Sequence, residues 1–143
     1  MGYKAEGFVS ESARNKDVAI RGPDDVLAVL PIKGYKRAKR EMFTVLLLNA
    51  RHELLKRVTV SVGSLNASVV HPREVFRAAV IEAAAAIVLV HNHPSGDPEP
   101  SEDDLTITRR LCQAGEILGI QVLDHVIIGA KGTVSLRNRR LIQ

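Results

Sequence analysis

The sequence predicts an α/β sandwich in which helices pack on a mixed β-sheet. Two observations lead to this prediction. Apolar segments of strand length, rich in Val, Leu and Ile, recur along the chain, as in residues 42–49 and 84–90. Segments with helical spacing of apolar residues lie between them, one beginning at Pro72 and one after Ser101. Strands that alternate with helices are typical of this fold class.

The chain divides into an N-terminal segment and one domain. Residues 1–22 are polar and unpatterned, and we interpret them as a tail or the stub of an upstream region. Residues 23–143 form the predicted domain, which begins with a short helix that has Asp24 and Asp25 in its first turn and ends at Pro31. The basic stretch up to Arg40 is predicted to be a connector.

Two strands, a helix and a third strand are expected next. Residues 42–49 form a near-continuous apolar run, the pattern of a strand covered on both faces. Residues 55–62 alternate well enough to return as a second strand, and residues 63–66 break that pattern. Pro72 opens a helix at its favoured first position. Residues 84–90 are predicted as a buried central strand.

The last third of the chain predicts a loop, a helix and two strands. The loop of residues 92–100 contains three prolines and a glycine. Ser101 is expected to cap the helix that follows, and Gly119 to end it. Two strands, at residues 120–128 and 133–137, are joined by a Gly-Ala-Lys-Gly turn.

Composition restricts the class of protein. A chain of 143 residues has the usual length of one domain. The single cysteine, Cys112, excludes an intrachain disulfide and suits a reducing compartment; we interpret it as a core residue. The longest apolar run, residues 83–90, is far shorter than the ~20 residues of a membrane-spanning helix, and no apolar signal core is present. We therefore expect a cytoplasmic protein with no membrane association.

The charge is mildly basic, with 20 Lys and Arg against 16 Asp and Glu. Basic residues gather in two places: Lys33, Lys36, Arg37, Lys39 and Arg40, and then Lys131, Arg137, Arg139 and Arg140. One interpretation is that these residues lie in solvated loops. The alternative is that they bind nucleic acid weakly and without specificity. With no Trp, two Tyr and three Phe, the chain offers few side chains on which bases could stack.

His91 and His93 stand two residues apart at the end of the predicted central strand. Residues i and i+2 of a strand point to the same face, so both imidazoles are expected on one side of the sheet. Two converging neutral imidazoles suit a divalent transition metal. Asp104, in the first turn of the next helix, is the best candidate for a third ligand. Two histidines and a carboxylate leave a fourth position for water, as in catalytic zinc sites.

Structural interpretations of the same residues stay open. A His-x-His pair is also compatible with polar surface residues at a strand end. Ser101 and Asp104 have the spacing of a capping box, which is compatible with a site because the cap would fix the turn that presents Asp104. Asp124 and His125 either support the site from behind or form a strand-end pair that faces solvent.

The residues His91, His93, Ser101 and Asp104 match the motif of the JAMM (MPN+) metalloproteases, His-x-His-x7-Ser-x2-Asp, at every fixed position. The string from residue 91 to 104 resembles the RadC-like branch of that family, as do residues 63–76 and 123–129. The resemblance covers roughly residues 22–140, too much for a chance match. It implies an MPN (JAB/RadC-like) domain with a three-layer, cytidine-deaminase-like arrangement.

The resemblance also implies roles for individual residues. His91, His93 and Asp104 would hold Zn²⁺, and Ser101 would help to stabilise the tetrahedral intermediate. The family uses a glutamate on an earlier strand to bind and deprotonate the attacking water. Glu41, fifty residues before His91, stands at that place. A solvated charge at a strand start is its alternative, and the rival glutamates, Glu74 and Glu82, both fall in a predicted helix.

The implied function is that of a zinc metallopeptidase that hydrolyses an amide or isopeptide bond in a peptide or protein substrate. The alternative is a DNA-binding, RadC-type repair factor without peptidase activity. A metal-free MPN-type interaction module is a third hypothesis, which is disfavoured because His91, His93 and Asp104 are all present. RadC-like proteins usually carry an upstream helix-hairpin-helix-like region, for which this chain has no room. The absence of P-loop, GxGxxG and GxSxG motifs leaves nucleotide binding and serine-hydrolase chemistry without support.

Overall fold

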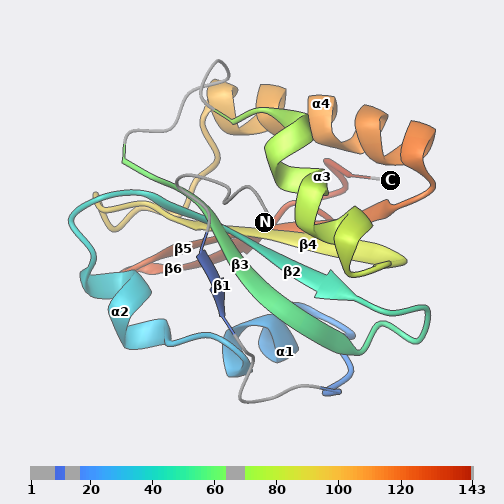
Figure 1. Cartoon of the computed structure of the whole chain (residues 1–143). Coiled ribbons are helices and arrows are strands. Elements are labelled where there is room, and N and C mark those ends of the chain that lie inside the picture. The colour runs from blue at the N-terminus through green and yellow to red at the C-terminus, as the bar shows by residue number, and fades with distance from the viewer. Residues whose placement is uncertain (1–8, 12–16, 64–69, 143) are drawn as a thin grey trace.

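The computed structural model describes residues 9–11, 17–63 and 70–142. In these residues a six-stranded sheet has the order β1-β3-β2-β4-β5-β6 (Figure 1). Its strands are β1 (Val9–Glu11), β2 (Met42–Leu48), β3 (Leu54–Val62), β4 (Ala86–Asn92), β5 (Gln121–Gly129) and β6 (Gly132–Ser135). β4 and β5 are parallel and the other neighbours are antiparallel, so the sheet is mixed.

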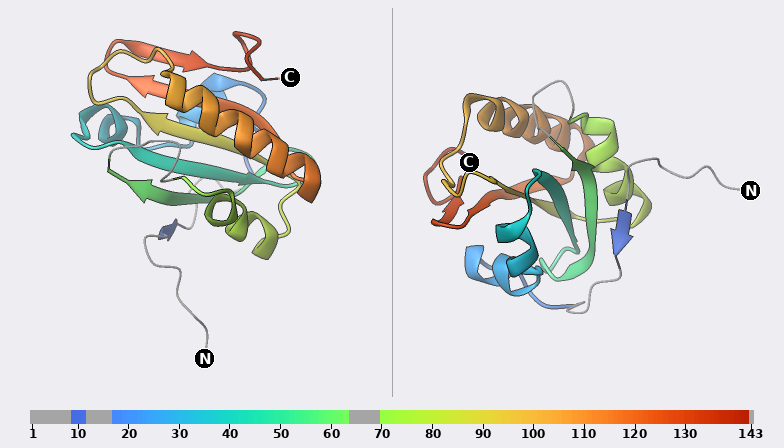
Figure 2. Two further views of the ribbon diagram at one scale, coloured as in Figure 1. Left: turned by 90° about the horizontal axis from the view of Figure 1, so that it is seen from above. Right: turned by 90° about the vertical axis from the view of Figure 1, so that its left-hand side faces the viewer.

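Helices cover both faces of this sheet. They are α1 (Pro23–Ala28), α2 (Ile32–Arg37), α3 (Pro72–Ile81) and α4 (Glu102–Leu118). Figure 2 shows α3 and α4 on one face and α1 and α2 on the other. A three-layer α/β architecture with a mixed sheet is therefore confirmed.

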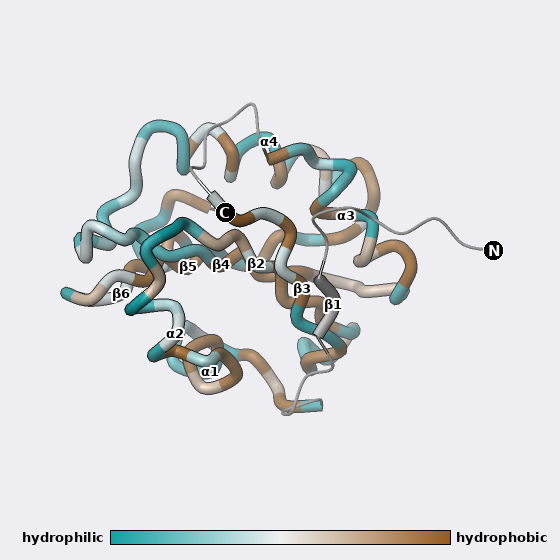
Figure 3. Tube along the Cα trace, turned by 60° about the vertical axis from the view of Figure 1, so that its left-hand side comes forward, coloured by the Kyte–Doolittle hydropathy of each residue, from teal (hydrophilic) through white to brown (hydrophobic). Residues whose placement is uncertain are grey.

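Hydrophobic clusters fill the spaces between the helices and the sheet. Phe76 of α3 and Ile107 of α4 lie in the cluster on one face, and Val26 of α1 and Tyr35 of α2 in the cluster on the other. Along α4, hydrophobic and hydrophilic residues alternate in helical fashion (Figure 3). Every residue of β4 is buried, because this central strand is covered on both faces.

The connection from β4 to β5 carries α4 across the sheet, as two parallel strands require. The helix begins with a capping box at Ser101 and ends at Gly119, whose φ of 72° is left-handed. Both ends were predicted from the sequence. Nine residues connect the end of β4 to the start of α4, and this loop folds back so that the first turn of the helix lies close to the last residues of the strand.

The predicted connector before Arg40 is wrong in part, because residues Ile32–Arg37 form the helix α2. Tyr35 is the reason: its ring is buried, and its hydroxyl makes a hydrogen bond with Thr44 Oγ1 of β2. One turn of helix anchors the apolar side while Lys33, Lys36 and Arg37 stay exposed. A single buried aromatic residue among cations gave too little periodicity to reveal it.

Part of residues 1–22, expected to be a tail, lies on the sheet. Residues 9–11 form the edge strand β1, which pairs with β3, and Ala19 forms a bridge with Glu53. Ile20 is buried. Of the predicted pattern break at residues 63–66, only Gly63 falls within the described residues. In the described parts of the chain, no helix has the length and hydropathy of a membrane span.

Candidate metal centre

Three side chains from two elements bring their polar atoms to one point. His91 Nε2 lies 3.0 Å from His93 Nε2 and 3.1 Å from Asp104 Oδ1. His93 Nε2 lies 3.0 Å from Asp104 Oδ2. His91 belongs to β4, His93 follows directly after that strand, and Asp104 is in the first turn of α4.

These separations fit a small divalent metal ion. Four ligands at 2.0–2.2 Å around a tetrahedral Zn²⁺ stand about 3.3–3.5 Å from one another. The two imidazole nitrogens and the carboxylate oxygens of Asp104 are only slightly closer together than that, and all of these atoms can act as acceptors. Two imidazoles and one carboxylate are a donor set that zinc commonly uses, so the residues present fit the ion that the resemblance implies.

β4 and the loop after it hold the two imidazoles in place. His91 is fully buried and stacks on Phe43 of β2, with ring centroids 6.1 Å apart. His93 Nδ1 lies 2.8 Å from the backbone carbonyl of Asp97, and its own backbone N–H donates to Ile128 of β5. Since Nδ1 meets an acceptor, its hydrogen is on Nδ1 and Nε2 is turned to the convergence point.

The capping box of α4 holds the third side chain. Asp104 Oδ2 accepts a hydrogen bond of 2.8 Å from the Ser101 backbone N–H, and Ser101 Oγ accepts one of 3.1 Å from the Asp104 N–H. The predicted capping box is therefore present, and it is compatible with a site at these residues. The cap fixes the rotamer that aims the carboxylate at the two imidazoles.

Electrostatics in this cluster favour a cation. Burial acts to raise the pKa of the Asp104 carboxyl, but the adjoining imidazoles of His91 and His93 outweigh it and hold that pKa far below its usual value. The hydrogen bond to Asp104 raises the pKa of His93, against the opposing effect of burial. The carboxylate is thus ionised, and a positive charge beside it is stabilised.

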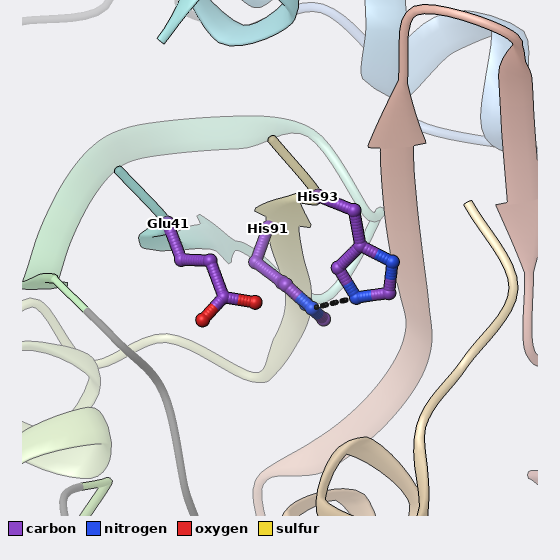
Figure 4. A group of neighbouring side chains, drawn as sticks. All are labelled: Glu41, His91 and His93. Atoms are coloured by element: carbon purple, nitrogen blue, oxygen red, sulfur yellow. Dashed lines mark hydrogen bonds between the residues drawn. The ribbon is translucent and has the colours of Figure 1, made fainter. Parts of the chain in front are cut away.

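Glu41, which directly precedes β2, approaches the same imidazoles. Phe43 pairs with His91 across the antiparallel β2–β4 ladder, so Glu41, two residues earlier, is level with His93. Ligand atoms of Glu41, His91 and His93 all lie within 4.8 Å of one another, and the carboxylate of Glu41 points toward the imidazoles (Figure 4).

The rival glutamates lie elsewhere. Glu82 forms an ion pair of 2.7 Å with Lys56, and Glu74 lies beside Arg73 in the first turn of α3. In the described residues, neither belongs to the group that Glu41 forms with the histidines.

Asn92 fixes the backbone on both sides of Glu41. Its Oδ1 accepts a hydrogen bond of 2.6 Å from the N–H of Met42, and its Nδ2 donates one of 3.0 Å to the carbonyl of Arg40. The side chain is buried. Asn92 was not predicted from the sequence, although its place between the two histidines was a signal, because on a strand it must point away from them.

Behind the two imidazoles, His125 and Asp124 have different hydrogen-bond partners. His125 is fully buried, and its Nε2 lies 2.7 Å from His91 Nδ1. Burial lowers the pKa of His125 well below its usual value, and the neighbouring His91 acts in the same direction. Asp124 instead accepts hydrogen bonds from Ser135 Oγ and the Arg137 N–H. Of the two candidates, only His125 contacts a histidine of the centre.

A mixed sheet with two histidines at the end of its central strand and an aspartate on the next helix defines a class of α/β domains whose side chains could hold a metal ion. The chain belongs to the RadC-like JAB domain family, whose model matches residues 20–141. The family predicted from the sequence is confirmed.

Proteins of known sequence agree with this assignment. The chain is similar to a UPF0758 protein of Desulforamulus reducens, with 51% identity over 125 residues, which is 87% of this chain and 55% of the relative. A UPF0758 protein of Methanosarcina mazei is 44% identical over 140 residues, 98% of this chain and 59% of the relative. The chain thus spans little more than half the length of these relatives, and their names state no activity.

Proposed function

We propose that this domain is a zinc-dependent hydrolase that cleaves an amide or isopeptide bond in a peptide or protein substrate. One observation carries the proposal: polar atoms of His91, His93 and Asp104 converge to within 3.1 Å beside the carboxylate of Glu41. A bound Zn²⁺ supplies activation of a water molecule and polarisation of the scissile carbonyl. The chain's own residues supply the ligands, the proton transfer and the stabilisation of developing charge.

Glu41 is the group that moves the proton. A general base has to be within hydrogen-bond reach of the water that it deprotonates, and Glu41 lies beside both imidazoles on the side of β2. The same carboxyl group then delivers the proton to the leaving amine. Asn92 supports this role, since it holds the backbone on either side of Glu41.

Ser101 is suited to donate to the oxyanion that forms on the substrate. Its Oγ accepts from the Asp104 N–H, and a hydroxyl has one hydrogen, which remains for a substrate oxygen. A donor of this kind typically contributes about 2.7–4 kcal/mol to transition-state stabilisation. Ser101 is exposed, so an incoming substrate can reach it.

Metal analysis of the purified domain tests the proposal. We expect about one zinc per chain in the wild type and none in His91→Ala/His93→Ala or in Asp104→Ala, with folding checked by circular dichroism. Zinc-loaded wild type, incubated with a library of proteome-derived peptides, should generate new amino termini that Glu41→Gln does not. Stoichiometric zinc in the double variant would exclude this centre, and a library that stays uncleaved would refute peptide hydrolysis.

Weak binding to nucleic acid is a second candidate, favoured by the position of the first basic cluster. All five of its cations are exposed on α2 and the residues just after it, and α2 packs beside β4 and β5. If all five reached phosphates, the slope of log K against log salt would be roughly −4 to −5. Fluorescence anisotropy with duplex and single-stranded oligonucleotides over a salt series measures it. Submicromolar, sequence-dependent affinity at physiological salt would favour a repair factor over a hydrolase.

A further inference from the structure

A buried chain of hydrogen bonds runs from α4 through β5 to the ligand on β4. Thr108 Oγ1 donates to the backbone carbonyl of Asp104 at 2.7 Å and lies 2.6 Å from His125 Nδ1. His125 Nε2 lies 2.7 Å from His91 Nδ1. The three side chains of this relay, Thr108, His125 and His91, are each at most 2% exposed. These side chains are therefore out of contact with water, which could otherwise replace a lost hydrogen-bond partner.

The position of each hydrogen in the relay follows from counting its hydrogen-bond donors and acceptors. A carbonyl oxygen only accepts, so the single hydrogen of the Thr108 hydroxyl goes to Asp104. Thr108 Oγ1 is then an acceptor for His125, whose hydrogen must be on Nδ1. A neutral imidazole has one N–H, so Nε2 of the buried His125 accepts, and the hydrogen between the two rings is on His91 Nδ1.

The other tautomer of His91, with its hydrogen on Nε2, is unfavourable for the contact with His125. With its hydrogen on Nε2, His91 would direct an unprotonated Nδ1 at the unprotonated Nε2 of His125, 2.7 Å away and fully buried. Two buried acceptors without a hydrogen between them forfeit a hydrogen bond and leave both groups desolvated. The Nε2–H of that tautomer would point at the Asp104 carboxylate, 3.1 Å away, and would have to be displaced before a metal ion could bind there.

We infer that Thr108 and His125 are positioning residues that keep the hydrogen of His91 on Nδ1, so that Nε2 is free to bind the metal ion. The inference rests on the proposed function, because an Nε2 atom without hydrogen is needed only if it binds zinc. It extends the centre by two side chains that touch neither the ion nor a substrate. Partners of this kind orient metal-binding histidines, and their loss typically weakens metal affinity about 10- to 100-fold.

His93 provides an internal control. Its Nδ1 is bound by the backbone carbonyl of Asp97, which no side-chain substitution removes. A change at Thr108 should therefore alter the tautomer of His91 and leave that of His93 as it is. A general loosening of the domain would affect both rings together.

Nitrogen-15 NMR of the histidine rings in the metal-free protein reads the tautomers directly. In the wild type we expect His91 to carry its hydrogen on Nδ1 alone. Thr108→Val, which has the same shape but no hydroxyl, should give His91 a mixture of both tautomers. Thr108→Ser should restore the wild-type signal. Thr106→Val is the matched control, because Thr106 is on the same helix and its hydroxyl accepts a hydrogen bond of 3.3 Å from the exposed side chain of Arg109.

Chelator competition then measures the consequence for metal binding. We expect the zinc Kd of Thr108→Val to rise about 10- to 100-fold, and those of Thr108→Ser and Thr106→Val to stay within about twofold of the wild type. His125→Phe, which removes the ring acceptor, should weaken zinc binding at least as much as Thr108→Val.

The two readouts separate the failure of this inference from failure of the proposed function. Hydrogen on Nε2 of His91 in the metal-free wild type would overturn the inference, whether or not any variant folds. Equal zinc affinity of wild type and Thr108→Val would overturn it too and leave the proposed function standing. A wild type that binds no zinc would overturn both.

Discussion

The backbone of the loop after His93 lies directly against Gly129 at the end of β5. A Cβ at residue 129 would be 2.7 Å from the carbonyl carbon of Gly96 and 3.2 Å from Pro98 N, and would overlap the Gly96 oxygen. The backbone of Gly129 is not in the left-handed region, so only this steric contact requires glycine. The loop is also held to β5 and the following turn by hydrogen bonds from the His93 and Lys131 N–H groups.

Gly129→Ala should therefore damage both the fold and the metal centre. Carbon atoms pack at about 3.5–4.0 Å, so the loop has to move by roughly 1 Å. A shift of that size takes the Asp97 carbonyl from 2.8 Å to beyond hydrogen-bond distance of His93 Nδ1. We expect a loss of about 1–3 kcal/mol in the free energy of unfolding from overpacking and a zinc Kd raised about tenfold or more.

Urea unfolding and chelator competition measure these two effects. Gly34→Ala is the matched control: a Cβ there meets nothing within 4 Å, and alanine within the helix α2 should be neutral or stabilising by up to about 1 kcal/mol. If Gly129→Ala had the unfolding midpoint and the zinc Kd of the wild type, the close approach of loop and strand would not support the centre as we argue.

Three further predictions follow from the same geometry. Glu41→Gln should retain zinc and lose hydrolysis; loss of zinc by metal analysis would instead make Glu41 a ligand. Asn92→Ala should keep zinc, lose at least tenfold in kcat and cost about 1–3 kcal/mol in urea unfolding, because it leaves two backbone groups beside Glu41 without partners. His93 has a raised pKa in the metal-free protein, so its protonated form stabilises the fold at low pH and this stability is lost as pH rises through that pKa. Zinc competes with this proton, so added zinc should raise the Tm more at about pH 8 than at about pH 6, and an equal rise would contradict the assignment.

The features that the sequence predicted well depend on short stretches of chain. The capping box of α4 is visible because Ser101 and Asp104 stand three residues apart, and the face shared by His91 and His93 follows from the period of a strand. The buried centre of the sheet was predictable for the same reason, since β4 is apolar at nearly every position up to His91.

The features that were missed depend on partners far along the chain. Thr108 looks like any threonine on a helix until β5 brings His125 against it, and Asn92 contacts backbone atoms fifty residues or more away. The helix α2 is similar, because Tyr35 is buried only once β2 supplies Thr44. The local sequence pattern does not indicate such contacts, which are seen only in the three-dimensional structure.

The register of β2 against β4 determines whether Glu41 faces the two histidines. Side chains alternate between the two faces of a strand, so a slip of one residue would turn Glu41 away from the histidines. In the described residues, backbone pairing of these strands extends from Leu48–Ala86 to Phe43–His91, where it ends. At that end the side chain of Asn92 binds Met42 and Arg40 in place of a backbone partner. Asn92 thus continues the pairing of β2 with β4 through its side chain. Its two hydrogen bonds hold the backbone on both sides of Glu41.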